Sequence, residues 1–441
     1  MAQGPLEDDG TDESAPPEQG GRKDVGARLR SLSKRILRLV RLALQVPLGL
    51  VLAGLTFVVP RDPERFAVVP RTPSAYDGNA KSWHVYVASD PGPEVATLIT
   101  NRARAAELGM LGMSAVAHLT PTSVWTLLRA GHVFFESTWW GGGFRGILTR
   151  GATRWQLWHG NGIKAVAFIN PSVQDKASGR SGLVRKLMLG RPDRVDVALF
   201  ASASQVERRG AAFNAHHNVV TGQTRDTFIV PPRPSHPAVE VGVDAEALGR
   251  VRHARSSGRR VVLYAPTWRS RRQLSHWVAL DWERMASTLD ALDAVLVVKA
   301  HAKDALGLSA EAFSQLGERV VVAAPKSDLI PLLVESDVMI TDYSSVFADF
   351  LLLDRPVLFF RYDDDTYAEH RALGEVERLP GRIVTTNAAL AEALEQALAS
   401  DPDAELRRGF ARGFIELPDG RSCERLMGLV REWNAGRRPA A

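Results

Sequence analysis

Residues 336–360 read SDVMITDYSSVFADFLLLDRPVLFF, and the order of apolar and polar residues in this stretch decides the fold. The apolar residues Val338–Ile340 predict a buried strand, and the apolar run that begins near Val346 predicts a helix. A second apolar strand is predicted after Pro356. A strand, a helix and another strand in this order are typical of a parallel βαβ unit, so the stretch predicts an α/β fold.

The residues between the first strand and the helix, Thr341–Ser345, form a candidate phosphate-binding loop. Where a parallel strand gives way to a helix, backbone N–H groups and the positive end of the helix dipole face a ligand. Open α/β sheets bind phosphate at such places. The alternative interpretation is a helix N-cap formed by Ser344 or Ser345, and capping and phosphate binding can coexist.

Short β-rich runs alternate with helical stretches from Phe66 onward, which implies further parallel βαβ units. The segment Val230–Gly242 contains four prolines and is typical of an interdomain linker. The pattern predicts two Rossmann-like domains that face a cleft, residues 60–235 and 236–432, followed by a tail of residues 433–441. The predicted strand-containing runs are His84–Ser89, His132–Ser137, Arg154–Gly160, Asp196–Ser202, Arg260–Trp268, Ala294–His301, Arg319–Ala324, Asp337–Ser345 and Arg355–Phe360.

A candidate general base stands in residues 158–164, which read WHGNGIK and follow one of these predicted strands. Gly160 and Gly162 allow the backbone to approach a ligand closely or to adopt positive φ. His159 is the side chain best suited to general-base catalysis near neutral pH. The alternative is a structural histidine, but its position between a strand end and two glycines favours a functional one.

A candidate phosphate-binding cluster stands in residues 297–303, which read VVKAHAK. In an extended chain Lys299, His301 and Lys303 project to the same side, and such a cluster suits a pyrophosphate. The alternative interpretation is a solvated strand end. Two further motifs contain polar groups: Tyr264–Arg269 (YAPTWR) and Thr221–Asp226 (TGQTRD).

The N-terminal part of the chain separates into three segments by charge and apolarity. Residues 1–21 lack an apolar pattern and read as a disordered tail; residues 1–20 carry six acidic residues and no basic one. Residues 22–42 carry eight basic residues and one acidic one, and apolar residues recur at helical spacing over Arg28–Ala43. This pattern predicts a basic amphipathic helix of the type that lies on anionic lipid.

The uncharged segment Leu42–Val59 follows directly and would be about 27 Å long as a helix. Three interpretations are open: a spanning helix, a re-entrant or interfacial anchor, and a buried core helix. The adjoining basic helix favours membrane attachment. Because Arg61, Arg65 and Arg71 put positive charge on the other side as well, we expect residues 22–59 to form a monotopic, membrane-associating segment at the cytoplasmic face of the cell membrane.

The overall composition excludes several classes of protein. The 441 residues include 55 Lys and Arg against 50 Asp and Glu, and a net charge of +5 argues against a bulk nucleic-acid binder. Cys423 is the only cysteine, which excludes an intramolecular disulfide and a Cys-based zinc site. Since no His, Asp and Glu set has clear metal-ligand spacing, we expect no obligatory metal and no other cofactor.

Taken together and in this order, the motifs resemble those of the CDP-glycerol glycerophosphotransferase family, the teichoic-acid primases and polymerases. The resemblance extends from about Pro60 to Val430 and includes Asn79–Lys81 (NAK) and Asp419–Ser422 (DGRS). The stretch ITDYSSVFADFLLLDRPVLFF is the most specific part of this resemblance. The chain departs from the family where it has Asn161 in place of the usual Thr, and Ala302 and Thr224 in place of Pro.

The resemblance implies a GT-B fold with the acceptor in the N-terminal domain and a CDP-alditol in the C-terminal one. It implies transfer of glycerol phosphate from CDP-glycerol to a hydroxyl of a membrane-linked acceptor, with release of CMP, in teichoic-acid-like cell-wall polymer synthesis. Alternatives are a CDP-ribitol-dependent ribitolphosphotransferase and a GT-B glycosyltransferase that uses a nucleotide sugar. A catalytically inactive membrane scaffold is a third, but the presence of both His159 and His301 counts against it.

The resemblance also suggests roles for individual residues. His159 is expected to take the acceptor proton, and His301, with Lys299, to offset charge on the leaving CMP. The expected partners are CDP-glycerol or CDP-ribitol, a lipid-linked glycan or polyol-phosphate acceptor and an anionic membrane surface, with no nucleic acid. Expected donor-binding residues are Lys299, Thr341, Asp342, Ser344, Ser345, Thr267, Arg269 and Arg225, and expected acceptor-side or loop residues are Gly160, Asn161 and Lys164.

Overall fold

The computed structural model describes residues 48–137, 144–160, 195–269, 276–301, 317–364 and 379–439. The predicted acidic tail and the basic helix over Arg28–Ala43 lie outside these residues. The chain divides into two compact units, Met1–Gly54 and Leu55–Ala441, and both sheets belong to the second unit. Residues 48–58 are helical. Among the described residues no helix has both the length and the apolar character that crossing a membrane requires.

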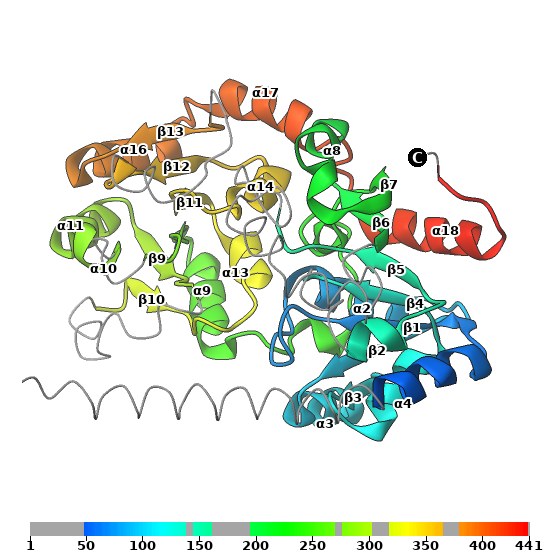
Figure 1. Cartoon of the computed structure of the whole chain (residues 1–441). Coiled ribbons are helices and arrows are strands. Elements are labelled where there is room, and N and C mark those ends of the chain that lie inside the picture. Colours follow the sequence, from blue (N-terminus) through cyan, green and yellow to red (C-terminus); the bar gives the residue numbers. More distant parts are fainter. Residues whose placement is uncertain are drawn as a thin grey trace, which may run out of the picture. The chain divides into compact units, whose positions relative to one another are not determined.

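The first sheet has seven parallel strands in the order β3-β2-β1-β4-β5-β6-β7 (Figure 1). The strand order grows outward from β1 on one side and from β4 on the other, so the topological switch point lies between these two strands. The strands are β1 (Asp62–Val69), β2 (Val95–Thr100), β3 (Ala115–Ala117), β4 (Ala130–Phe135), β5 (Thr153–Gln156), β6 (Val195–Phe200) and β7 (Ala215–Val220).

The helices connected to this sheet position its loops. Helix α2 lies between the sheet and two later elements, η4 and α18, and its Trp83, Val85 and Val87 are fully enclosed in the core of this half. The helical elements are α2 (Gly78–Ser89), α3 (Arg102–Met110), α4 (Pro121–Arg129), α5 (Phe144–Leu148), α8 (Ala203–Arg209), η3 (Gly210–Phe213), η4 (Thr224–Phe228), η5 (Pro237–Val239) and α18 (Ser422–Asn434).

The strand predicted at His84–Ser89 is wrong, because these residues form the second half of α2. A helix that is covered on several sides carries apolar residues all round and lacks the stripe that marks an exposed helix. Its β-branched and aromatic residues therefore resemble a buried strand in the sequence. Tertiary burial outweighs the local propensity here.

The second sheet has six parallel strands in the order β10-β9-β8-β11-β12-β13, with its switch point between β8 and β11 (Figure 1). The strands are β8 (Arg260–Tyr264), β9 (Ala294–Val298), β10 (Val320–Val322), β11 (Val338–Thr341), β12 (Val357–Phe360) and β13 (Arg382–Val384). The helical elements are α9 (Ala245–Ser256), α10 (His276–Ala279), α11 (Trp282–Ala291), α13 (Ile330–Glu335), α14 (Phe347–Phe350), η6 (Leu351–Leu353), α16 (Asn387–Ala399) and α17 (Ala404–Phe414).

Both faces of the second sheet are buried. Along β8, Val261 and Leu263 pack into one apolar cluster with α9, α13 and α14, while Val262 and Tyr264 pack into another with α11 and α16. Successive strand side chains point to opposite faces, so a strand covered on both sides is apolar throughout. This explains why β8 to β12 were clear from the sequence, whereas the short β13, of which only one residue is buried, was not predicted.

The chain passes between the two sheets twice. It leaves the first lobe, the seven-stranded sheet with its helices, through residues 229–242, and it returns from the second lobe after α17. The last helix, α18, packs in the core of the first lobe, where Cys423, Leu426 and Met427 are buried with residues of α2 (Figure 1). The sequence placed residues up to 432 in the second domain, whereas the contacts of α18 join it to the first.

Candidate active site

The candidate phosphate-binding loop lies at the switch point of the second sheet. Asp342, directly after β11, accepts hydrogen bonds from the backbone N–H of Thr267 at 2.9 Å and from its hydroxyl at 2.7 Å. The Thr341 hydroxyl donates to the carbonyl oxygen of Ala265 at 2.8 Å. These polar side chains therefore join the loop after β11 to the loop after β8, which is the place where open α/β sheets bind ligands.

Arg269 forms buried ion pairs with two carboxylates at this junction. Its guanidinium lies 2.8 Å from Asp342 and 2.6 Å from Asp363, and all three side chains are almost fully buried. Tyr343 and Tyr362 cover the guanidinium with their rings. Thr341, Asp342, Thr267 and Arg269, all expected to bind the donor, thus lie together, and the contacts of Asp342 and Arg269 hold the shape of the loop.

Ser344 and Ser345 occupy the part of the loop that precedes α14. The helix begins at Phe347, and neither hydroxyl caps it, because the N-cap residue is Val346 and makes no side-chain capping bond. Both serines are half-buried, so their hydroxyls border the loop surface. The N-cap alternative is therefore not what the structure shows.

The turn after β5 carries His159. Trp158 has a φ of +56°, a left-handed conformation that costs a bulky residue free energy and that is concentrated at functional sites. The His159 Nδ1–H donates to the carbonyl oxygen of Glu136 at 3.1 Å, since a carbonyl can only accept. This bond leaves Nε2 as the nitrogen with the lone pair, which is the form that a general base requires.

The charge state of His159 also suits a base. The side chain of His159 is exposed, yet protein atoms lie close around it, and this desolvation, aided by Arg71, Arg225 and Arg209, lowers the pKa of His159 to about 4. At neutral pH the ring is neutral. A phosphate anion bound near the three arginines would oppose their effect and make Nε2 a stronger base.

The turn that carries His159 and the Ser345 loop touch each other. A Cβ atom on Gly160 would lie 2.8 Å from the Ser345 Oγ, so the backbone of the turn approaches the serine as closely as glycine allows. Residues from the carboxyl ends of both sheets are therefore adjacent. Asn161 and Lys164, predicted on the same turn, lie outside the described residues.

Lys299 and His301 follow β9 of the second sheet. The Lys299 ammonium is buried and donates to the carbonyl oxygen of Pro325 at 2.8 Å. Burial lowers the pKa of Lys299 to about 8, although Asp77 and Asp328 act in the opposite direction. His301 is exposed at the end of the described segment. The pair thus places an ammonium group and an imidazole at one strand end.

Two buried ion pairs join the lobes beside these loops. Arg225, on η4, donates through Nε and Nη2 to the Asp349 carboxylate of α14 at 2.9 and 2.7 Å. Lys81, on α2, lies 2.8 Å from Asp328 of the second lobe. Arg225 was predicted to bind the donor; its guanidinium engages α14, the helix that follows Ser345, and so acts on the loop from behind.

Three residues of the first switch point were missed by the sequence analysis. Glu136, after β4, is fully buried and accepts the backbone N–H groups of Ala80 at 2.8 Å and Arg71 at 3.2 Å. Burial raises the pKa of Glu136 to about 7, and Asp77 adds to this effect. Arg71 lies 3.1 Å from Asp77. Their position after β1 and β4 is the signal, but it appears only once the strand order is known.

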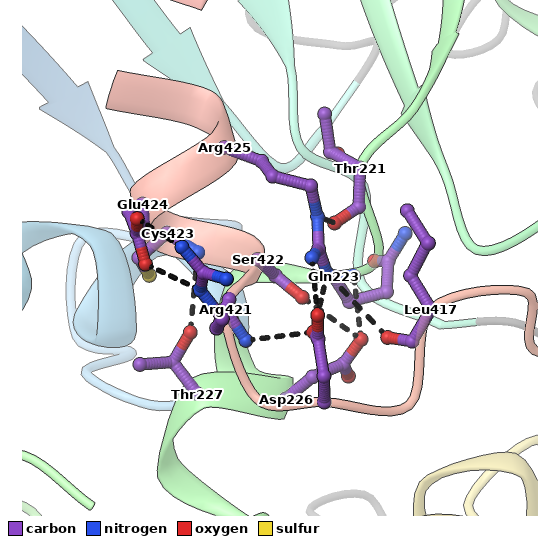
Figure 2. A network of polar contacts seen from close by, with 11 residues as sticks. Thr221, Gln223, Asp226, Thr227, Leu417, Arg421, Ser422, Cys423, Glu424 and Arg425 are labelled. Carbon is purple, nitrogen blue, oxygen red and sulfur yellow. Dashed lines mark hydrogen bonds and ion pairs between the residues drawn. The ribbon is translucent and has the colours of Figure 1, made fainter. Parts of the chain in front are cut away.

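Two motifs that are far apart in the sequence meet at the rear of this site (Figure 2). The Ser422 hydroxyl lies 3.4 Å from Asp226, and the Cys423 N–H donates to the Thr227 hydroxyl at 3.1 Å. Arg425 donates to the carbonyl oxygen of Thr221 at 3.0 Å. The segments TGQTRD and DGRS therefore form one support, which fixes η4 and with it Arg225.

Within the described residues, no group of three or more His, Cys, Asp or Glu side chains is placed to hold a metal ion. Among the described residues, Arg71 and Lys299 are two cations that lie at these strand-end loops. Together with the neutral His159 and the serine loop, they can bind a phosphate-bearing substrate and accept a proton from a nucleophile.

Comparison with known proteins identifies relatives of the chain. The family model described as CDP-Glycerol:Poly(glycerophosphate) glycerophosphotransferase matches residues 55–432. A teichoic acid glycerol-phosphate transferase of Staphylococcus aureus is 31% identical over 177 residues, which make up 38% of this chain and 44% of that protein. A teichoic acid poly(glycerol phosphate) polymerase of Bacillus subtilis is 33% identical over 186 residues, 39% of this chain and 24% of that protein.

The S. aureus teichoic acid ribitol-phosphate polymerase TarK is similar to nearly the same degree, 29% identical over 177 residues, 38% of this chain and 33% of that protein. The matches thus span less than half the length of these curated relatives.

Solved structures show the same fold. The wall teichoic acid polymerase TagF superposes with a TM-score of 0.66 and 19% identity over 91% of this chain and 98% of that one. A TagF variant soaked with CDPG gives a TM-score of 0.65 and 18% identity over 85% of this chain and 90% of that one.

The predicted α/β class with parallel sheets is confirmed by the two sheets, and its GT-B-like character agrees with these neighbours. Since the family model covers both lobes and most of the chain, the chain belongs to the CDP-glycerol:poly(glycerophosphate) glycerophosphotransferase family.

Proposed function

We propose that this chain is an enzyme that transfers glycerol phosphate from CDP-glycerol to a hydroxyl of a membrane-linked acceptor, releasing CMP, in the synthesis of a teichoic-acid-like polymer. The observation that supports this proposal is the contact between the His159 turn and the Ser345 loop, the two segments proposed to supply the base and to bind the phosphates. The family and the relatives named for glycerol-phosphate transfer support it.

On the acceptor side, His159 is the general base. The acceptor oxygen attacks the phosphorus that bears glycerol, and the acceptor proton passes to Nε2 of His159. Because the Glu136 carbonyl holds Nδ1–H, the ring cannot turn to present the wrong nitrogen. Asn161 and Lys164 are proposed to line the acceptor path next to Gly160.

On the donor side, the Ser344–Ser345 hydroxyls and the backbone of the loop bind the diphosphate, supported from behind by Asp342, Thr267 and Arg269. The bond from the attacked phosphorus to the oxygen that bridges to CMP breaks, and CMP leaves with that oxygen and its negative charge. Lys299 and His301 offset this charge. Catalysis then rests on positioning and charge stabilisation.

CDP-ribitol is the second candidate donor, because a relative named as a ribitol-phosphate polymerase is nearly as similar as the glycerol-phosphate enzymes. The two donors differ only in the alditol, which lies beyond the phosphates. A nucleotide-sugar glycosyltransferase is the third candidate and shares the two-sheet fold.

We further propose that residues 22–59 hold the enzyme on the cytoplasmic face of the membrane without crossing it. The exposed apolar side chains of the helical residues 48–58, among them Leu50 and Phe57, support a contact with lipid. The basic residues before them suit anionic headgroups.

A release assay tests the reaction. The purified full chain is incubated with an acceptor in membranes and, in separate reactions, with CDP-glycerol, CDP-ribitol or a UDP-sugar, and the released nucleotide is measured by chromatography. We expect CMP from CDP-glycerol at a rate well above that of the His159→Ala variant. Release of UDP without CMP would assign the chain to the glycosyltransferases, and CMP from CDP-ribitol alone would change the donor.

A further inference from the structure

Asn79 lies at the centre of a hydrogen-bond cluster that reaches both lobes. Its side chain is completely buried, so it cannot touch a substrate. Its Nδ2 lies 3.0 Å from the carbonyl oxygen of Leu157, 3.0 Å from that of Trp158 and 2.6 Å from Gln223 Oε1. Its Oδ1 accepts the backbone N–H of Arg225 at 3.2 Å.

One side of this cluster is the turn that carries His159. Trp158 has a left-handed backbone, which is strained for a bulky residue unless its surroundings hold it. Two amide side chains do so: Gln156 Oε1 accepts the Trp158 N–H at 3.1 Å, and Asn79 donates to the Trp158 carbonyl. The next residue is His159, so the direction of its ring depends on both bonds.

The other side of the cluster leads to the phosphate loop. Arg225, whose backbone N–H is bound by Asn79, holds Asp349 of α14 with its guanidinium. Helix α14 follows Ser345 directly. One buried amide thus touches the support of the base and the support of the loop at once.

We infer that Asn79 is a positioning residue that holds His159 in the base orientation by fixing the Trp158 turn, an inference that rests on the proposed function. Without the amide, the Trp158 carbonyl loses its donor and the turn can relax to an ordinary backbone conformation. His159 then leaves the Glu136 carbonyl, and both the tautomer and the depressed pKa of the ring are lost.

A double-mutant cycle tests this on the full chain. Asn79→Ala is expected to lower kcat about tenfold while the donor KM changes less than about twofold, because the amide bonds the turn of the base directly, whereas the Arg225 guanidinium keeps its ion pair with Asp349 behind the loop. In a His159→Ala background the same substitution should have no further effect on kcat. An equal loss in both backgrounds, or a rise in donor KM with kcat unchanged, overturns the inference.

Asn387→Ala is the matched control. Asn387 also donates from Nδ2 to a backbone carbonyl, that of Ala279 at 2.9 Å, and accepts a backbone N–H, that of Asp281 at 3.0 Å, but it lies in the second lobe beside α10. It should leave kcat and KM unchanged. If it lowers kcat as much as Asn79→Ala does, the effect is general destabilisation and the inference fails.

NMR of the full chain with 15N-labelled histidine supplies a readout that needs no substrate. The His159 signal, assigned by its absence in His159→Ala, should show the Nδ1–H tautomer at neutral pH. In Asn79→Ala, and in the isosteric Asn79→Asp if the first variant does not fold, the pKa of His159 should return toward its usual value of about 6.5. An unchanged signal overturns the inference, even if the chain releases no CMP and the proposed function has failed.

Discussion

At the scale of single residues, the candidate site can be tested through the protonation of its side chains. His159 acts as a base only when deprotonated, and its pKa is lowered to about 4 by desolvation and nearby arginines. Lys299 offsets negative charge only when protonated, and burial lowers its pKa to about 8. In the proposed reaction these two groups therefore limit the active pH range from opposite sides.

We expect kcat/KM, which reports the free enzyme, to fall as the pH drops through about 4 and as it rises through about 8. In Lys299→Arg the alkaline decline should move upward, because a guanidinium stays protonated. The measurement is kcat/KM from CMP release over a pH series. An alkaline decline that stays in place in Lys299→Arg would assign it to another group.

Replacing either histidine should reduce turnover without unfolding the protein. We expect His159→Ala and His301→Ala each to lower kcat by about 10²-fold or more, the usual contribution of a general base or of a group that stabilises charge. The exposed His253 of α9 provides the control, and His253→Ala should keep the wild-type kcat. Near-normal turnover in a variant would remove that histidine from the mechanism.

At the same scale, the sequence identified some residues of the site and not others. His159, Gly160 and Ser345 could be predicted, because their chemical types at strand ends are typical of catalytic and phosphate-binding loops. Glu136 could not, since it acts on His159 through a backbone carbonyl, which every residue possesses. The support that Asn79 gives to Trp158 depends on a contact between residues far apart in the chain.

The loop between β11 and α14 is the element that we expect to bind the donor. Replacing both Ser344 and Ser345 by Ala should raise the donor KM several-fold and leave the acceptor KM nearly unchanged, because the hydroxyls contact the donor phosphates alone. Initial rates at varied donor and acceptor concentrations separate the two constants. Ser400→Ala, the same change on the exposed end of α16, should alter neither.

Equal increases in both constants would instead indicate that the double variant distorts the loop. Since neither serine caps α14, loss of helix stability is not the expected cause of a weaker donor affinity.

Strands and helices could be predicted where their burial produces a simple pattern of apolar residues in the sequence. Strands such as β9 and β11 are enclosed on both faces, and a continuous apolar run is the signature of that environment. Helix α2 was mistaken for a strand because it is enclosed as well and therefore lacks a polar face. The packing of α18 against the first lobe could not be predicted, since an apolar helix face indicates that the helix is buried but not which element buries it.

For the molecule as a whole, the buried ion pair between Lys81 and Asp328 is expected to stabilise the union of the two lobes. Lys81→Met leaves the Asp328 carboxylate buried without its cation and should lower the free energy of unfolding by about 3–5 kcal/mol. The second change in Lys81→Met/Asp328→Asn removes the uncompensated charge and should restore part of the loss. Urea unfolding measures both.

The half-exposed pair of Arg252 and Glu335 is the control for that experiment. Arg252→Ala should cost less than about 1 kcal/mol, as is usual for exposed pairs. A loss in Lys81→Met no larger than this would show that the buried pair does not stabilise the molecule.

The proposed membrane attachment is tested on the whole chain. Deleting residues 22–59 should give a protein that still uses a soluble acceptor analogue at the wild-type rate but works at least about tenfold more slowly on anionic vesicles, since both segments proposed to bind lipid are lost. Co-sedimentation with vesicles of anionic and of neutral lipid measures the attachment. In sealed inside-out vesicles, protease should digest both the tail and the body, and a protected body would contradict a monotopic anchor.

The double passage of the chain between the sheets limits how the enzyme can move. A lobe joined to its neighbour by one connecting segment can rotate about any axis. A lobe joined by two separate segments rotates about the line that passes through both connections. Residues 229–242 and the segment after α17 are those two connections, and the second is fastened by the bond from the Glu416 N–H to the Ala201 carbonyl. Any rotation of one lobe against the other is thus confined to the axis through these two connections.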